Sequence, residues 1–419
     1  MLSSRGKQSA ETFDIPWRYA TAPTYNKEKG SDGIISFGLA EHGPARDDIV
    51  NFIINKVKFD TNSVCYGSMA TESRLPAAAA AHINRYFKPL QPVEPEMIVK
   101  ASGCSAAGNM LSFALTEPGD GVLVSRPVYG RFELDYGLQG GAEVVYADTD
   151  SDEAFSPASI PKYEKALQEA EARGVRIKAL LLVNPHNPVG RCYPTETLIE
   201  ILKFCNKHQI HLISDEIYAL CVFDSGNPDA TLFTSILSLA TPELINQNLV
   251  HVLYGFAKDF ASGGLHLGFI ISHNTELRRA LSALLRFHGP SAAVETIGTA
   301  ILEDEEFVVK YTEKSRKDLA FSYRIATSTL DQEGINYIKG GNAGFFLYID
   351  LSPYLPKDES LGYREREFVL AQQLLDNGLF LHPGEEHCKE AGWFRLVYTH
   401  DEDVLREGLR RLLKTIKPQ

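Results

Sequence analysis

Cysteine, long apolar runs and positive charge are all scarce in this chain of 419 residues, and each scarcity excludes a class of protein. Six cysteines occur, without a CxxC pair or a dense cluster, so we expect neither a disulfide framework nor a zinc site. No apolar run approaches the ~18 residues of a membrane helix, and the N-terminus lacks the apolar segment of a signal peptide. We therefore expect a cytoplasmic protein without membrane contacts.

Positive charge is in deficit because 42 lysines and arginines stand against 54 aspartates and glutamates, which gives a net charge of −12. A surface this acidic argues against nucleic acid or an anionic membrane as the main partner. The remaining composition is that of a globular protein, with 44% hydrophobic and 23% charged residues. At this length we expect two or three domains.

Strand-like and helix-like segments alternate from residue 96 onward. The clearest strand is 177–183, in which six of seven residues are apolar. Other strands are expected at 97–102, 121–125, 144–146, 211–214, 250–254 and 267–271, and helices at 105–115, 162–173 and 195–208. Apolar strands joined by helices indicate a mainly parallel α/β sheet, whose ligands lie at the carboxyl ends of the strands.

The pattern turns helical from about residue 276 to residue 330, and a second, smaller domain is expected to follow. Its strands are expected at 344–349, 379–382 and 393–398, and its helices at 365–377 and 402–413. We predict a domain boundary inside the long helical stretch. The expected division is an N-terminal arm with part of the small domain (1–85), a large domain (86–305) and a small C-terminal domain (306–419).

Four polar side chains follow three of the expected strands directly. Asp215 and Tyr218 come after the strand at 211–214, Lys258 after the strand at 250–254, and Asn184 after the strand at 177–183. Because the carboxyl ends of parallel strands meet at one edge of a sheet, we expect these four groups to converge. An ion pair or loop cap explains any one of them, but not all four together.

Several motifs occur in the order found in one enzyme family, over nearly the whole chain. They lie at 38–41, 66–67, 102–105, 126–129, 184–190, 211–218, 257–259, 341–345 and 392–395. The chain thereby resembles the fold-type-I pyridoxal-phosphate enzymes of the aspartate aminotransferase class. Within that class it is most similar to the 1-aminocyclopropane-1-carboxylate synthase branch. This resemblance implies a seven-stranded sheet with helices on both faces and a smaller α+β domain.

The resemblance also implies pyridoxal 5′-phosphate as cofactor and assigns residues to it. Lys258 would carry the cofactor as a Schiff base and act as the base at Cα, since burial readily lowers a lysine pKa. Asp215 would hold the proton on the pyridine nitrogen. Tyr218 and Asn184 would bond the cofactor's 3′ oxygen, and Tyr129 would stack on its ring.

Substrate and partner contacts follow from the same resemblance. Arg395 would bind the α-carboxylate of an amino-acid substrate, a task that suits its planar, bidentate guanidinium. Glu41 and the adjacent Ala40 would lie close to the substrate. Tyr66 would reach the cofactor phosphate of a neighbouring subunit, which implies a homodimer with shared active sites.

The expected phosphate cradle is Gly103, Cys104 and Ser105, where a strand ends and a helix begins, so that helix N–H groups face the anion. Two departures from the family pattern affect it. The usual Ser-x-Ser before the lysine is Gly255-Phe256-Ala257 here, and the usual phosphate-binding arginine is His266. A histidine still donates to phosphate, but its charge is weaker and depends on pH.

These residues leave three functions open. The favoured one is carbon–sulfur bond cleavage, or synthase-like chemistry on a thioether or sulfonium amino acid. An aminotransferase is the alternative, and a catalytically silent regulator on this fold is the third. No metal is expected, because the histidines at 42, 186, 382 and 387 lack ligand spacing and are interpreted as loop or core residues.

Overall fold

A seven-stranded sheet organises the larger part of the chain in this computed structural model, which describes residues 1–14, 25, 33–65, 73–150, 152–384 and 390–417. The strand order is β2-β8-β7-β6-β5-β3-β4, and β8 alone runs antiparallel to its two neighbours. The strands are β2 (Ile98–Ala101), β3 (Gly121–Arg126), β4 (Glu143–Asp148), β5 (Ile177–Val183), β6 (His211–Asp215), β7 (Val250–Gly255) and β8 (Gly268–Ser272). The expectation of a mainly parallel sheet is confirmed.

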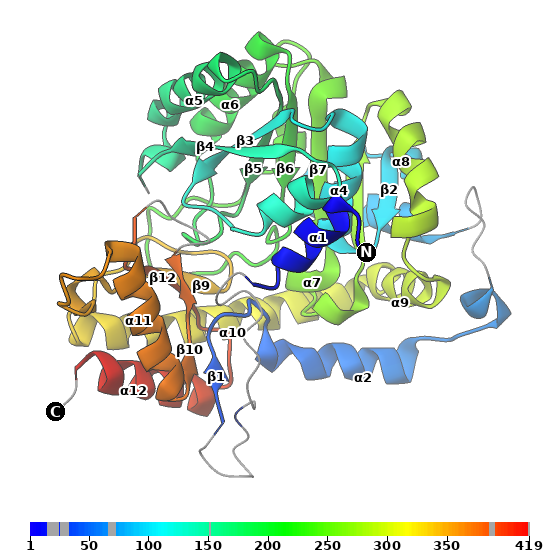
Figure 1. The fold of residues 1–419 in the computed structure, drawn as a ribbon. Helices are drawn as coiled ribbons and strands as arrows, with labels where there is room; N and C mark the ends of the chain where they lie inside the picture. Colours follow the sequence, from blue (N-terminus) through cyan, green and yellow to red (C-terminus); the bar gives the residue numbers. More distant parts are fainter. Residues whose placement is uncertain (15–24, 26–32, 66–72, 151, 385–389, 418–419) are drawn as a thin grey trace.

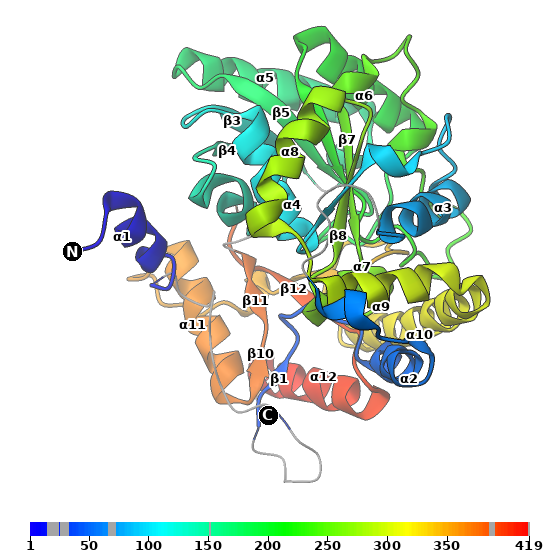
Figure 2. The same ribbon diagram turned by 90° about the vertical axis from the view of Figure 1, so that its right-hand side faces the viewer.

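Both faces of this sheet are buried, which explains its nearly continuous apolar strands. In β5, Leu180 and Leu182 face one hydrophobic core, whereas Leu181 and Val183 face the other. Four helices pack their buried side chains into the first core: α3 (Leu75–Phe87), α5 (Ile160–Ala172), α6 (Thr195–His208) and α9 (Ala292–Glu303). Two helices pack into the second core: α4 (Gly103–Leu115) and α8 (Thr275–His288). Figures 1 and 2 show the sheet enclosed between these layers.

The second domain is built around its own core and a three-stranded antiparallel sheet of order β11-β12-β9. Its elements are β9 (Phe346–Asp350), α11 (Tyr363–Asp376), β11 (His382–Pro383), β12 (Trp393–Val397) and α12 (Glu402–Ile416), together with the parallel pair β1 (Ile35–Ser36) and β10 (Leu379–Phe380). The strand expected at 379–382 is therefore divided between two sheets. In Figure 1 this domain lies beside the lower edge of the large one.

The core of the small domain and one core of the large domain meet along a single long helix. Helix α10 (Glu305–Gln332) contributes Val308 and Tyr311 to the large-domain core, and from Leu319 onward to the small-domain core. At the N-terminal side the cores differ from the expected limits, because α2 (Arg46–Lys56) and α3 pack on the large domain. Of the described part of residues 1–85, the segment Ile35–Ala40 enters the small-domain core and Tyr25 packs against it.

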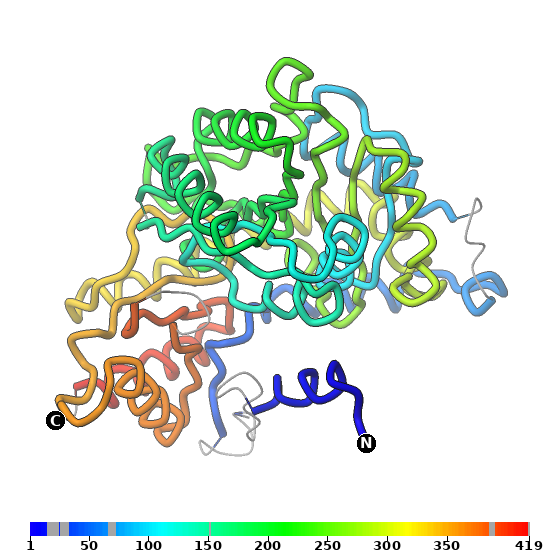
Figure 3. The backbone as a smooth tube through the Cα atoms, turned by 45° about the horizontal axis from the view of Figure 1, so that its top comes forward, coloured from blue at the N-terminus to red at the C-terminus, as the bar shows by residue number. Residues whose placement is uncertain are grey.

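The N-terminal helix α1 (Ser4–Glu11) has no buried residue and stands apart from both domains in Figure 3. Of the helices in the described ranges, none combines the length and the apolar character that a membrane crossing requires.

Candidate active site

A cavity of about 490 Å³ lies between the two domains, at the carboxyl ends of β5 and β6. The large domain lines most of it, and the small domain contributes Gly38, Leu39, Ala40, His382 and Arg395. Its polar side chains include Ser102, Cys104, Ser105, Tyr129, Arg131, Asp135, Asn187, Asp215, Tyr218, Lys258 and His266. The expected convergence of Asp215, Tyr218 and Lys258 is thus present.

Lys258 lies in α7 (Phe256–Asp259), a single helical turn that begins directly after β7. Its ammonium donates to the carbonyl oxygen of Ala40 at 2.6 Å. Removal from bulk water lowers the pKa of Lys258 to about 8, and the positive charge of Arg395 acts in the same direction. The amine therefore becomes a neutral nucleophile or base closer to physiological pH than an exposed lysine does.

Asp259 fixes the turn that carries Lys258. This buried carboxylate accepts hydrogen bonds from the backbone N–H of Leu220 and from the thiol of Cys221, each at 3.0 Å. Both donors belong to the segment that follows Tyr218. The loops after β6 and β7 are consequently held together below the cavity.

Asp215 ends β6 and presents a buried carboxylate to the cavity, where it accepts a hydrogen bond from the N–H of Ile217 at 3.2 Å. Burial raises its pKa to about 7. A cation opposite this carboxylate would restore its ionised form. The next residue, Glu216, turns away and accepts from Ser214, Ser235 and the N–H of Ile236, which anchors the strand end.

The first turn of α4 forms one wall of the cavity, with Gly103, Cys104 and Ser105 in its lining. Gly103 has φ +86°, a conformation that favours glycine. Gly268 of β8 packs so closely that an added Cβ would come within 2.8 Å of the Gly103 carbonyl carbon. This contact holds the helix N-terminus, with its N–H groups, at the cavity wall. His266 lines the same region.

Arg395 reaches the cavity from β12 in the small domain and is only 5% exposed. Its Nη1 donates to Oδ1 of Asn187 at 3.2 Å, and its Nη2 donates to the carbonyl oxygen of Gly38 at 2.7 Å. The guanidinium is therefore oriented before any ligand arrives.

The expected role of Asn184 has to be corrected. Its amide donates to the carbonyl of Thr234 at 3.0 Å and accepts from the N–H of Tyr193 at 3.2 Å, so both of its polar atoms hold the loop. The cavity is lined instead by Asn187, three residues further on in the same turn. Sequence reasoning selected the first asparagine after the strand, whereas the fold of the turn exposes the second.

The other predicted residues divide into two groups. Tyr129 and Ala40 line the cavity, as expected. Glu41 forms an ion pair with Arg46 and is not itself part of the cavity lining, but its carboxylate lies at the cavity edge, with Oε1 3.6 Å from the position of a Cβ added to the lining residue Gly263. Tyr66 lies outside the described residues.

Several cavity residues were not foreseen from the sequence. Arg131 and Phe132 lead into a π-helix, Glu133–Leu138, whose Asp135 also faces the cavity. Asp135 accepts a hydrogen bond from Ser105, and burial raises its pKa to about 6. A π-helix has no simple apolar period, so no sequence pattern pointed to these residues. His382, interpreted as a loop or core histidine, also lines the cavity.

The donor set fits pyridoxal 5′-phosphate. An amine with a lowered pKa, a buried carboxylate in need of a cation, and helix N–H groups suited to a phosphate share one cavity. Arg395 supplies a separate site for a carboxylate. Within the described ranges, no group of three or more His, Cys, Asp or Glu side chains is arranged to hold a metal ion.

Comparison with known proteins agrees with this geometry. The family model described as "Aminotransferase class I and II" matches residues 55–412. The chain is 30% identical to 1-aminocyclopropane-1-carboxylate synthase-like protein 1 of Mus musculus, over all of this chain and 84% of that protein. It is 35% identical to a probable aminotransferase of Claviceps purpurea, over 79% of this chain and 76% of that protein. An aspartate aminotransferase variant of Thermus thermophilus shares the fold, with a TM-score of 0.75, 22% identity, and coverage of 99% of this chain and 97% of that one.

Proposed function

This chain belongs to the family of class I and II aminotransferases, which use pyridoxal 5′-phosphate, and on that premise we propose that it removes the Cα proton of an α-amino acid. Pyridoxal 5′-phosphate is its cofactor. The observation that carries the proposal is the convergence of Lys258, Asp215 and Arg395 on one cavity. Each of these groups has a separate task in such a reaction, and each is held by a hydrogen bond to the protein.

Bound pyridoxal phosphate supplies an electron sink for the negative charge that remains when Cα loses its proton. Lys258 would hold the cofactor, and after the amino acid displaces it, its neutral amine would take the proton from Cα. Asp215 would keep the pyridine nitrogen protonated, and Tyr218 and Asn187 would face the ring oxygen. The α4 N-terminus and His266 would hold the phosphate, while Arg395 would hold the substrate α-carboxylate.

The proposed outcome is carbon–sulfur bond cleavage, or 1-aminocyclopropane-1-carboxylate synthase-like chemistry, on a thioether or sulfonium amino acid. This proposal is supported by the name of the Mus musculus relative, a synthase-like protein whose alignment covers the whole of this chain. The departures from the family pattern at Gly255, Ala257 and His266 argue against simply assigning the plant-type synthase activity, and a larger thioether amino acid is the substrate we favour. The carboxylate of Glu41 pairs with Arg46 at the cavity edge beside Gly263, and we propose it as a contact for a cationic substrate group.

Product analysis tests the proposal. Purified holoenzyme would be incubated with a panel of common amino acids and thioether amino acids, each with and without a 2-oxo acid, and the products measured by mass spectrometry. Release of a thiol or thioether without any 2-oxo acid requirement supports the proposed chemistry. Products formed only when a 2-oxo acid is added would reject it.

The second candidate is amino-group transfer, which the name of the Claviceps purpurea relative favours. Both reactions begin with the same proton removal and use the same lysine, aspartate and arginine. In the product analysis, an aminotransferase converts the added 2-oxo acid stoichiometrically into an amino acid. A silent regulator, the third candidate, would show no change of the cofactor absorbance when amino acids are added.

We also propose that the protein is a homodimer with shared active sites. This rests on the family and on the motif at residue 66, which lies outside the described residues. Sedimentation of the holoenzyme would show whether its mass is that of a dimer. Two inactive variants with substitutions at different site residues would then be mixed, and recovery of activity would show that the subunits share their active sites.

A further inference from the structure

His382 and Arg395 are direct neighbours across two antiparallel strands. In the pairing of β11 with β12, the Cα of His382 stands opposite the Cα of Arg395. Side chains at directly opposed positions project from the same face of a sheet, with Cβ atoms about 4.5–5.5 Å apart. Both side chains line the cavity, and each is only 5% exposed. The imidazole therefore lies beside the guanidinium on the same cavity wall.

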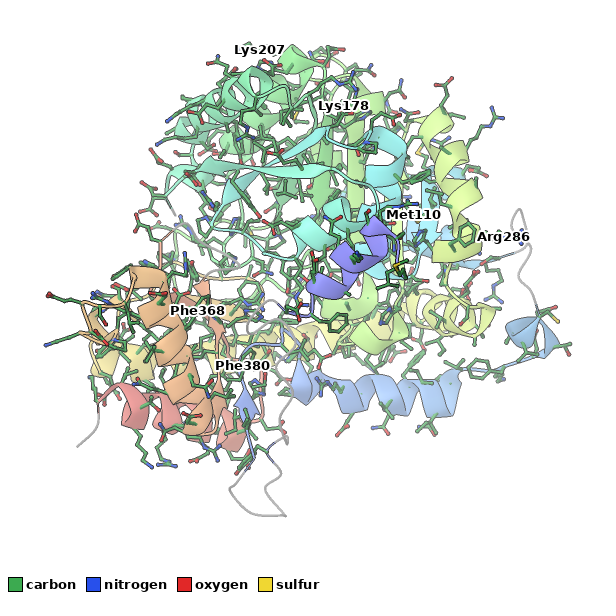
Figure 4. All side chains as sticks on the ribbon, viewed as in Figure 1. Met110, Lys178, Lys207, Arg286, Phe368 and Phe380 are labelled. Carbon is green, nitrogen blue, oxygen red and sulfur yellow. The ribbon has the colours of Figure 1, made fainter. Side chains whose placement is uncertain are left out.

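Packing around His382 restricts its ring to this position. The ring of Phe380 meets it edge-on, with centroids 5.6 Å apart. Phe380 is labelled in Figure 4 beside β1, whose Ser36 is its strand partner. Gly38 packs against the same two rings, since an added Cβ would come within 2.4 Å of the Phe380 ring and 3.6 Å of the His382 ring. Only glycine therefore allows this segment to approach the Phe380 ring so closely, and the His382 ring lies at ordinary contact distance from it.

The same segment holds the guanidinium, because the carbonyl oxygen of Gly38 accepts from Nη2 of Arg395. Gly38, His382 and Arg395 thus form one corner of the cavity. The segment of Gly38 and the two strands β11 and β12 meet there. A carboxylate that binds in this corner meets donors from two side chains.

A carboxylate can use more donors than one guanidinium supplies. Its two oxygens offer about four lone-pair sites, and a bidentate guanidinium fills two of them. An imidazole on the same wall can donate to a third, and hydrogen bonds to a charged group are the stronger kind. The cofactor-binding roles proposed above leave His382 unassigned.

We propose that His382 is a second contact for the α-carboxylate of the substrate and acts together with Arg395 to select ligands that carry this group. The inference rests on the proposed function, since it assumes that Arg395 faces an amino acid. Its contribution is to affinity, so substitution changes KM and leaves kcat nearly constant. A histidine that only packed on Phe380 would instead affect stability.

Binding of unreactive ligands to the holoenzyme tests this separately from catalysis. The ligands would be an α-methyl amino acid, which has no Cα proton to lose, and the amine in which a second methyl group replaces its carboxylate. Their dissociation constants would be measured by calorimetry and by the cofactor absorbance. In His382→Leu we expect affinity for the α-methyl amino acid to fall roughly 10- to 100-fold, the loss of one hydrogen bond to a charged group. Affinity for the amine should stay within about twofold.

Two further variants keep the test independent of folding. His382→Asn retains a side-chain donor and should recover most of the lost affinity. His400→Gln is the matched control, because His400 lies in the same domain and packs on Phe37 but does not line the cavity. It should bind both ligands like the wild type.

The outcomes separate the two proposals. Equal loss for both ligands, no loss for either, or a failure of His382→Asn to recover affinity would overturn the role of His382. So would a wild type that binds neither ligand. A carboxylate-specific loss in His382→Leu, in an enzyme that converts no amino acid, would support His382 and reject the proposed function alone.

Discussion

Lys258 donates its ammonium proton to the carbonyl oxygen of Ala40 across 2.6 Å, and this bond joins the two domains. Two residues earlier on the same segment, the carbonyl of Gly38 accepts from Arg395. Lys258 and Arg395 are therefore bonded to one short piece of backbone.

Lys258→Ala should abolish covalent attachment of pyridoxal phosphate and nearly all turnover, because no other lysine lines the described part of the cavity. Attachment would be measured by borohydride reduction followed by peptide mass spectrometry. Lys178→Ala is the control, since Lys178 lies in β5 away from the cavity and is labelled in the upper part of the large domain in Figure 4. A reduced adduct on another lysine of the Lys258 variant would contradict the assignment.

Capture of the cofactor should depend on pH with a midpoint near 8. The reaction needs the neutral amine, and desolvation lowers the pKa of Lys258 from 10.5 to about 8. Lowering the pKa of a base moves its neutral form to lower pH, so capture should rise through pH 8 and level off above it. The rate of absorbance change after mixing cofactor-free protein with pyridoxal phosphate measures this. A rate that continues to rise toward pH 10 would show that Lys258 is solvated.

The two asparagines of the turn after β5 should respond differently to substitution. Asn184→Ala leaves the N–H of Tyr193 and the carbonyl of Thr234 without their partner, so the free energy of unfolding should fall by about 1–3 kcal/mol. Asn187→Ala should instead weaken substrate affinity, because Arg395 loses a contact that orients it. Denaturant unfolding and KM measurements on both variants would check this. The reverse pattern would return the site role to Asn184.

Arg395→Lys should weaken binding of the amino-acid substrate by about 1.5–3 kcal/mol, since an ammonium cannot form two parallel bonds to a carboxylate. Arg411→Lys serves as the control. Arg411 is equally buried in the same domain, but its guanidinium holds the carbonyls of Gly33 and Gly378. Equilibrium binding of substrate measures the effect, and unchanged affinity in Arg395→Lys would remove this residue from the carboxylate site.

His266→Arg should tighten binding of the cofactor phosphate, because guanidinium is always charged and binds bidentately. This prediction rests on the position of His266, which lines the cavity where α4 begins. Cofactor retained after dialysis would be compared with that of the wild type and of His273→Arg, a histidine that does not line the cavity. Equal or poorer retention would mean that the phosphate is held without residue 266.

Much of the fold follows from local patterns. The strands at 177–183 and 211–214 and the helix at 195–208 were predicted to within a residue, because apolar runs and amphipathic periods are local properties. Asp215 and Lys258 could be selected for the same reason, since each follows such a run directly. The division of 379–382 between β10 and β11 could not be predicted, because it depends on which sheet each residue joins.

The sequence by itself thus determined the α/β class, the ends of β5 and β6, and the choice of Lys258 and Asp215. Only the tertiary structure decided that Asn187 lines the cavity in place of Asn184, that Glu41 pairs with Arg46, and that His382 faces the cavity. The physical reason is distance along the chain. Gly38 and Arg395 lie 357 positions apart, and only the docking of one domain on the other brings such segments into contact. No local pattern records which side chain or carbonyl will stand at that junction.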